Sequence, residues 1–387
     1  MKFKNLAIIS DCIHVFDENG KPATENHIFK RQMEALANKF QQTLICCPFV
    51  PYSNNKIISV YSHPQIQFIS LPNVGGATVL SKIQLIKIIP VWLKAFKKAN
   101  KFADIIYQRF PNNINIPGFF YFYFKKAKTF ATYTGTWKNY KTEPATYRFQ
   151  KWLLKKIFRG PVFIYTMEKL RKENFFKSIS PSYTLQEWEE ETKSIENKIN
   201  RLITHQKFIP TFITVGSLVA NKNQQYILDA FKILHEEQFP FQLYIVGDGV
   251  LKNTYQQFIE KNQLTNQVFL IGKKTHIELR ALYRKADFLV QAPLAEGFGK
   301  VPVEGFFHGV IPLLNNVGLA KEMTGNNERG FLFYANNKIN LVQLIKQINA
   351  QKNLLPQMIT NGRIFSRSQT LENWANDYAE IINRYFE

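Results

Sequence analysis

The chain has few cysteines and no long apolar runs. Its 387 residues include only three cysteines, Cys12, Cys46 and Cys47, and the last two are adjacent inside an apolar run. We therefore expect no disulfide framework and a reduced, cytoplasmic compartment. No run of about 18 apolar residues occurs, so no transmembrane helix is predicted. The apolar stretch at the N-terminus is too short for a signal peptide and indicates a buried strand.

Acidic residues are scarce in one part of the chain. The net charge is +21, from 50 basic and 29 acidic residues. Residues 1–200 hold 30 basic against 14 acidic residues, and residues 201–387 hold 20 against 15. Within residues 51–160, 18 basic residues face only Asp104 and Glu143. This imbalance predicts an anionic partner: nucleic acid, an acidic polymer or a membrane surface.

Two segments of the basic half have the pattern of amphipathic helices. Residues 80–103 place Leu85, Trp92 and Phe96 on one side and five lysines opposite, and residues 147–159 place Arg148, Lys151, Lys155, Lys156 and Arg159 around Trp152. Tryptophan among lysines is typical of a lipid interface, although the apolar sides also suit packing on a sheet. No nucleic-acid-binding motif accompanies the charge, so we expect an anionic membrane and no nucleic acid.

Short apolar runs alternate with helical patterns along the whole chain, which is typical of parallel α/β units. Each half contains six such runs. We predict strands at 6–10, 43–47, 66–71, 104–108, 129–133 and 161–165, and at 211–216, 241–247, 267–272, 288–291, 310–314 and 330–333. The charged segment 186–200 reads as a solvated helix or linker, and residues 371–387 as a closing helix. The pattern predicts a first domain over 1–190 with the closing helix 368–387, and a second over 200–367.

The segment from Ala295 to Glu304 is the most informative motif. Glu296 and Glu304 flank a glycine turn, and Pro302 suits the first turn of a following helix. Gly297 and Gly299 allow close backbone approach, and the first amides of a helix lack intrahelical partners, so they can hold a diphosphate. A Glu in a first helical turn also occurs simply because it favours the helix dipole. The segment predicts either a nucleotide-sugar site or a capped helix.

Other segments of the second half end strands in a comparable way. Val215-Gly216-Ser217 precedes Lys222, whose ammonium could reach a phosphate at the strand's carboxyl end, although a surface lysine would also fit there. Gly247 and Gly272 close two further strands. Gly318, Glu322 and the run 329–332 follow the Glu296 segment in order.

Taken together, these ordered segments resemble the retaining nucleotide-sugar glycosyltransferases of family 4, which have the GT-B fold. The resemblance covers nearly all of the second half. It implies two Rossmann-like domains facing a central cleft, with a C-terminal helix that crosses back to the N-terminal domain. The donor would bind mainly in the second domain, and no metal or cofactor would be needed, since a lysine and helix amides stabilise the departing diphosphate.

The resemblance implies roles for residues at matching positions. Glu296 and Lys222 would be the catalytic residues, with Glu296 on the donor sugar, Lys222 on the diphosphate and Glu304 on the ribose. The implied donor site also includes Gly216, Ser217, Gly247, Gly297, Phe298, Gly299, Lys300 and Val301. On the acceptor side, the resemblance implies Glu25, Arg109 and Thr136.

The chain departs from the family pattern at three places. Ser217 stands where the family usually has an arginine, Pro22-Ala23 stands where it has a glycine pair, and no histidine occurs at Tyr133 to Trp137. The first departure removes one phosphate contact or moves it elsewhere. The other two departures leave the acceptor-binding residues of the first domain unassigned by the family pattern.

The resemblance predicts a metal-independent hexosyltransferase on the inner face of the cell membrane. It would move a sugar from a UDP-sugar, or a GDP-sugar, to a lipid-linked or cell-surface glycan in bacterial-type polysaccharide, lipopolysaccharide or capsule assembly. Two alternatives stay open: a non-catalytic GT-B-like binding or partner subunit, and a sugar-nucleotide epimerase. No acid and base set for an epimerase is identifiable.

Overall fold

The computed structural model describes residues 2–53, 56–73, 79–140, 143–204 and 209–387. The chain divides into two compact units. Unit 1 consists of Met1–Ser182 with Leu371–Glu387, and unit 2 is Tyr183–Thr370. No helix in these described residues is long and apolar enough to cross a membrane.

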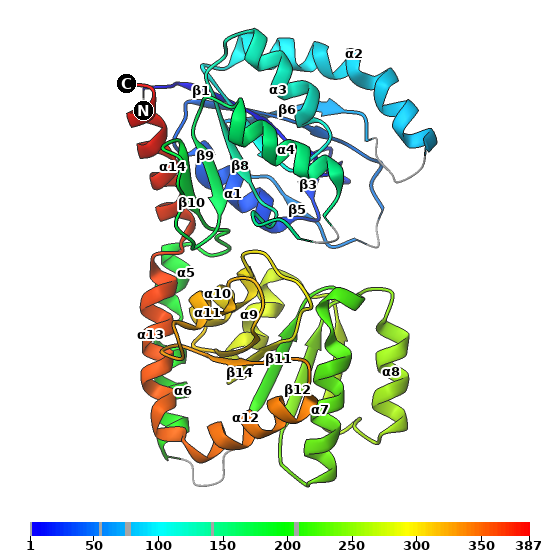
Figure 1. The fold of residues 1–387 in the computed structure, drawn as a ribbon, viewed down its shortest axis with the longest axis vertical. Coiled ribbons are helices and arrows are strands. Elements are labelled where there is room, and N and C mark those ends of the chain that lie inside the picture. The colour runs from blue at the N-terminus through cyan, green and yellow to red at the C-terminus, as the bar shows by residue number, and fades with distance from the viewer. Residues whose placement is uncertain (1, 54–55, 74–78, 141–142, 205–208) are drawn as a thin grey trace. The chain divides into compact units, whose positions relative to one another are not determined.

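Unit 1 is built on a seven-stranded parallel sheet in the order β10-β9-β8-β7-β1-β4-β6 (Figure 1). All six strands predicted in this half are confirmed, and β10 at its edge is an addition. Their near-continuous apolar composition suits a parallel sheet covered on both faces. The strands are β1 (Asn5–Ile9), β4 (Gln42–Pro48), β6 (Ile66–Leu71), β7 (Ile105–Phe110), β8 (Thr129–Tyr133), β9 (Val162–Tyr165) and β10 (Phe175–Ser178).

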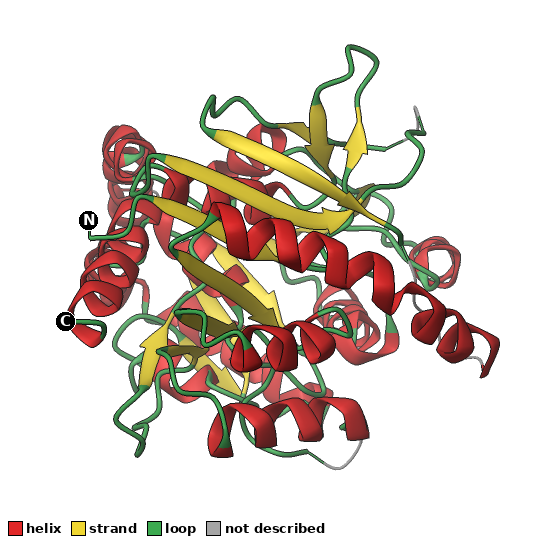
Figure 2. Ribbon diagram, turned by 90° about the horizontal axis from the view of Figure 1, so that it is seen from above, coloured by secondary structure: helices red, strands yellow, loops and turns green. Residues whose placement is uncertain are grey.

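Helices cover both faces of this sheet (Figure 2). On one face, Leu6 and Ile8 of β1 pack with α1 (His27–Ala37) and α14 (Leu371–Tyr385). On the other face, Ala7 and Ile9 pack with α2 and α3, while α4 packs beside α3 on β8 and β9. These three helices are α2 (Val79–Phe102), α3 (Asn115–Phe124) and α4 (Ala145–Lys156). The closing helix therefore packs in unit 1, although it follows unit 2 in the chain.

A small antiparallel sheet lies beside the main one in unit 1. It contains β2 (Val15–Phe16), β3 (Pro22–Thr24) and β5 (Ser59–Val60). Pro22 and Ala23, which stand where the family has a glycine pair, are thus in a strand that pairs on both sides. The sequence pattern did not predict this sheet.

Unit 2 is built on a six-stranded parallel sheet in the order β13-β12-β11-β14-β15-β16. All six predicted strands are confirmed to within two residues. They are β11 (Thr211–Val215), β12 (Gln242–Val246), β13 (Val268–Gly272), β14 (Phe288–Gln291), β15 (Ile311–Asn315) and β16 (Phe331–Phe333). The fold class predicted from the sequence, α/β with two parallel sheets, is confirmed.

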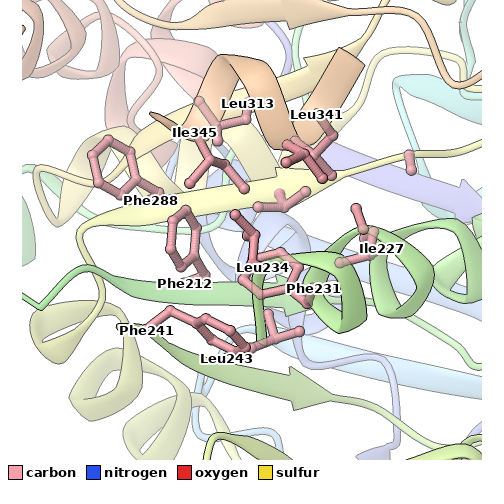
Figure 3. Close-up of a cluster of buried hydrophobic side chains, with 14 of the residues drawn as sticks. Phe212, Ile227, Phe231, Leu234, Phe241, Leu243, Phe288, Leu313, Leu341 and Ile345 are labelled. Carbon is pink, nitrogen blue, oxygen red and sulfur yellow. The ribbon is translucent and has the colours of Figure 1, made fainter. Parts of the chain in front are cut away.

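The largest core of unit 2 joins its sheet to five helices, α6, α7, α8, α12 and α13. Phe212, Leu243 and Phe288 meet Phe231 of α7 and Ile345 of α12 in this core (Figure 3). The opposite face of the sheet packs on Tyr283 of α9 and on residues next to α10. The helices of unit 2 are α5 (Leu185–Glu190), α6 (Thr192–Thr204), η1 (Ala220–Lys222), α7 (Gln224–Glu236), α8 (Lys252–Lys261), α9 (His276–Lys285), α10 (Lys300–Phe307), α11 (Ala320–Thr324), α12 (Lys338–Ala350), η2 (Lys352–Leu354) and α13 (Leu355–Arg367).

The junction region differs from the prediction. Residues 183–190, which the sequence placed with the first domain, belong to unit 2, because Glu187 and Glu190 of α5 pair with Arg280 of α9. The expected solvated helix is two helices with buried charges. Glu191 and Lys198 are both buried, and Glu191 pairs with Arg280 and Arg284.

The two amphipathic helices exist, and their apolar sides pack on the sheet. Trp92 and Phe96 of α2 are buried in the core, while the side chain of Leu85 lies outside the described residues. One expectation for α4 is wrong. Lys151 is buried rather than part of a basic surface, because it pairs with buried Glu143 and donates to the carbonyl oxygens of residues 136–138.

Candidate functional site

The Glu296 segment forms the turn and helix that its residues predict. Gly299 is the N-cap of α10 in the left-handed conformation, with φ of +67°, and no side chain caps the helix. No side chain therefore accepts a cap hydrogen bond from the first backbone amides of α10. These amides can donate to an anionic ligand instead. Gly318 has to be glycine, because a Cβ there would overlap the carbonyl oxygen of Glu296.

A pocket with a cavity volume of about 120 Å³ opens at this turn. The carboxyl ends of β14 and β15 supply Gln291 and Leu314, in keeping with ligand sites of parallel sheets. The predicted donor residues that line the pocket are Lys222, Glu296, Gly297, Phe298, Gly299, Lys300 and Val301.

Lys222 and Glu296 meet inside the pocket. The Lys222 ammonium donates to Oε2 of Glu296, and both side chains are half-buried. Asn221 fixes their approach: its side-chain amide donates to the carbonyl oxygen of Ala295 at 2.9 Å, and its carbonyl accepts from the amide of Leu294 at 2.8 Å. The two predicted catalytic residues are therefore held together by short η1 and the loop before α10.

Glu304 lies behind the pocket wall. Its residue is 6% exposed, and its Oε2 accepts a hydrogen bond from the Tyr283 hydroxyl at 3.3 Å. It does not line the described pocket, whereas neighbouring Val301 and Pro302 do. Glu304 and Glu296 thus lie at different depths around the start of α10.

The other predicted donor residues have backbone roles. A Cβ on Gly247 would overlap the carbonyl oxygen of Gly216, so these two glycines let β11 and β12 end close together. The carbonyl oxygen of Ser217 accepts from the Gln224 side chain at 3.1 Å. Gly216, Ser217 and Gly247 do not line the described pocket.

The three residues predicted on the acceptor side all lie in unit 1. Glu25 pairs with Lys56 at 2.6 Å, and Arg109 lies at the end of β7, where it donates to the Tyr107 hydroxyl at 3.2 Å. The carbonyl oxygen of Thr136 accepts from Lys151. Their assignment to an acceptor stays a prediction.

Several residues that line the pocket were not predicted from the sequence. Asn315 lines the pocket and donates from its side chain to the carbonyl oxygen of Pro293 at 2.8 Å, while Gln291 donates to that of Val215 at 3.1 Å. Their position at strand ends was the available signal. Val317, Leu319 and Met323 complete an apolar wall. Over the described part of the chain, no three His, Cys, Asp or Glu side chains gather in a metal-binding arrangement.

Comparison with known families identifies the segment that carries this pocket. The family model described as glycosyl transferases group 1 matches residues 196–365. The matched segment contains the whole pocket, both catalytic candidates and Tyr283.

Curated proteins similar to the matched segment are named as glycosyltransferases. An uncharacterised glycosyltransferase of Methanocaldococcus jannaschii is 30% identical over 179 residues, which cover 46% of this chain and 49% of that protein. The putative glycosyltransferase EpsD of Bacillus subtilis is 26% identical and covers 43% of this chain and 45% of that one. The chain thus spans about half the length of the curated relatives that it matches.

Solved structures match the whole chain in fold. HepE of Anabaena, whose structure was determined with UDP and glucose, has a TM-score of 0.70 at 14% identity and covers 98% of this chain and 99% of its own. WaaG, a glycosyltransferase involved in lipopolysaccharide biosynthesis, has a TM-score of 0.66 at 14% identity over 97% and 99%. The chain therefore has the fold of GT-B glycosyltransferases.

Proposed function

We propose that this chain is a retaining, metal-independent glycosyltransferase that moves a sugar from a nucleotide-diphosphate sugar to a lipid-linked or cell-surface glycan. The observation that carries the proposal is the pocket where Lys222, Glu296 and the free end of α10 converge. The proposed setting is bacterial-type polysaccharide, lipopolysaccharide or capsule assembly. A UDP-sugar is the favoured donor and a GDP-sugar the second choice, since HepE of similar fold was determined with UDP.

The chemistry proposed for the pocket is the stabilisation of a leaving group. When the bond between the sugar and the diphosphate breaks, negative charge grows on the departing oxygen. Lys222 and the first amides of α10 would stabilise that charge, and such preorganised donors contribute most where water is excluded. With Lys222 turned to the diphosphate, the Glu296 carboxylate is released to accept hydrogen bonds from the sugar.

We further propose that unit 1 attaches to an anionic membrane through the outer face of α2, α3 and α4. The two acidic residues within residues 51–160 already have other partners. Glu143 is buried and pairs with Lys151, and Asp104 accepts hydrogen bonds from the amides of Lys4 and Asn5 at 2.7 and 2.9 Å. Exposed apolar and basic side chains share this face. They are Lys87, Val91, Leu93, Lys94, Lys97, Lys98 and Lys101 of α2, Phe120 and Phe124 of α3, and Arg148, Phe149, Trp152, Lys155 and Lys156 of α4.

The donor assignment is tested by calorimetric titration and transfer assays. The purified chain is first titrated with UDP, GDP, ADP and dTDP, and the corresponding sugars are then assayed for turnover. Glu304→Gln should weaken nucleotide binding by about 1–3 kcal/mol, the cost of a charge-assisted hydrogen bond. Glu296→Gln should lower transfer more than affinity. Glu328→Gln, on an exposed side chain of the same unit, is the matched control.

If Glu304→Gln lowers mainly transfer and Glu296→Gln lowers mainly nucleotide affinity, the roles of the two glutamates are exchanged. If neither variant changes affinity or transfer, the donor site is overturned. Nucleotide binding without turnover on any donor would favour a non-catalytic partner subunit. The specific argument for that alternative is Ser217, which stands where the family usually has an arginine.

A further inference from the structure

Tyr283 is a buried tyrosine whose hydroxyl reaches the Glu304 carboxylate. The residue is 0% exposed, and its hydroxyl donates to Oε2 of Glu304 at 3.3 Å. A buried hydroxyl costs free energy unless it is hydrogen-bonded, whereas phenylalanine would fill the same space without that cost. The hydroxyl therefore needs an explanation beyond packing, and its partner Glu304 supplies one.

The tyrosine is held firmly from two other sides. Its ring stacks on the buried ring of His308, with centroids 5.3 Å apart and planes 10° from parallel. Its carbonyl oxygen accepts from the buried ammonium of Lys198 at 3.2 Å. His308 follows α10 and lies beside buried Glu191, with Nδ1 3.2 Å from Oε2. The hydroxyl is thus presented from a fixed ring in α9 to a carboxylate in α10.

We propose that Tyr283 is a positioning residue for ribose recognition, because its hydroxyl fixes the Glu304 carboxylate in the orientation that meets the ribose hydroxyls. The inference rests on the proposed function, in which Glu304 binds the ribose. A glutamate side chain that is already ordered loses less conformational freedom when the ligand binds. Removing the Tyr283 hydroxyl should therefore weaken binding only of ligands that have ribose hydroxyls.

The test compares two ligands in matched variants. Tyr283→Phe keeps the ring on His308 and removes only the hydroxyl. Tyr255→Phe is the control, since Tyr255 is also buried in unit 2, outside the pocket. Each protein is titrated with UDP and with 2′,3′-dideoxyuridine diphosphate. We expect Tyr283→Phe to weaken UDP about tenfold, the size of one hydrogen bond to a charged group, and to leave the dideoxy ligand unchanged.

Donor kinetics give a second readout that a purely structural role would not give. We expect a higher KM for the donor in Tyr283→Phe with kcat nearly unchanged, and no change in Tyr255→Phe. An equal loss for both ligands, or none for either, would overturn the positioning role. The thermal midpoint of each variant is measured beside the titrations, so that a folding defect is recognised by its effect on both ligands.

Glu304→Gln separates this inference from the proposed function. If it removes the preference for UDP over the dideoxy ligand while Tyr283→Phe keeps that preference, the positioning role alone fails. If Glu304→Gln leaves the preference intact, the ribose assignment itself fails. If the chain binds GDP instead of UDP, GDP and its dideoxy analogue are used in the same design, and binding of neither nucleotide overturns both proposals.

Discussion

His14 is a buried histidine that its surroundings keep neutral. Its ring lies among Phe29, Phe49, Tyr61 and Phe68, with ring centroids between 5.5 and 5.7 Å away. Nδ1 is 2.7 Å from the carbonyl oxygen of Cys12, and Nε2 is 3.0 Å from the Tyr61 hydroxyl. A neutral ring that donates from Nδ1 and accepts at Nε2 satisfies both contacts. Burial lowers the pKa of His14 from 6.5 to about 4.

This pKa predicts a loss of stability in acid. Between pH 6.5 and about 4 the unfolded chain binds a proton at His14 that the folded chain does not, so the free energy of unfolding falls as the pH falls. The full effect is about 3 kcal/mol. In His14→Gln this contribution is absent, so its stability should fall less across the same window. Parallel pH profiles of the two proteins would contradict the prediction.

Urea unfolding followed by tryptophan fluorescence suits this measurement. Four of the five tryptophans, Trp92, Trp137, Trp152 and Trp374, belong to unit 1, so the signal reports mainly on the unit that contains His14. Unit 2 contributes only Trp188 to this signal.

At the scale of residues, the sequence predicted the residues that line the pocket better than the buried residues behind them. Lys222, Glu296 and Lys300 meet in one pocket because each follows a strand end or begins a helix, which a pattern along the chain can indicate. Tyr283 was not predicted, since its place beside Glu304 depends on how α9 packs against α10. Contacts between elements that are distant along the chain leave little signal in a single sequence.

At the scale of elements, α4 shows where helical periodicity is insufficient. The spacing placed Lys151 with Arg148 and Lys155, yet Lys151 is buried and the other two are exposed. Its ammonium pairs with Glu143 and donates to Asn139 Oδ1 at 3.0 Å, besides the carbonyl oxygens of the loop. The loop after β8 covers this side of the helix, and only the folded chain shows that cover. Short apolar runs, in contrast, were enough to predict twelve strands, whereas the very short β2, β3 and β5 and the edge strand β10 were not found.

Lys151 should therefore stabilise unit 1 strongly. Lys151→Met removes the ammonium that neutralises a buried carboxylate and satisfies three loop carbonyls. Breaking a buried pair by removing one partner costs about 3–5 kcal/mol, because a charge is left uncompensated. The free energy of unfolding of unit 1, measured by the same fluorescence, should fall by that amount.

The control for α4 is Lys156→Met, five residues further along the same helix. Lys156 is exposed, so its replacement should change the free energy of unfolding by no more than about 0.5 kcal/mol. Equal effects of the two variants would show that Lys151 does not have the structural role that its contacts indicate. A second variant, Glu143→Gln, should be destabilising as well, since it leaves the ammonium of Lys151 without its charged partner.

At the scale of the whole molecule, the basic excess is concentrated in the part of unit 1 that we propose to meet a membrane. Binding to vesicles of phosphatidylglycerol and phosphatidylcholine should exceed binding to phosphatidylcholine alone, and it should weaken as salt is raised. The triple variant of Lys94, Lys97 and Lys98 to alanine removes three exposed charges of α2. Each is worth about 1 kcal/mol near an anionic surface, so we expect at least a tenfold loss of vesicle affinity.

The matched control removes the same number of charges from unit 2. Lys261, Lys285 and Lys338 are exposed there, and their replacement by alanine should leave vesicle binding nearly unchanged. Phe124, which is 75% exposed on α3, tests the apolar contribution, because Phe124→Ser should weaken binding equally at low and high salt. Equal losses from the two lysine triples would mean that net charge alone attracts the vesicles. The proposed face would then be wrong, while UDP binding, measured on the same variants, would still stand as evidence for the donor site.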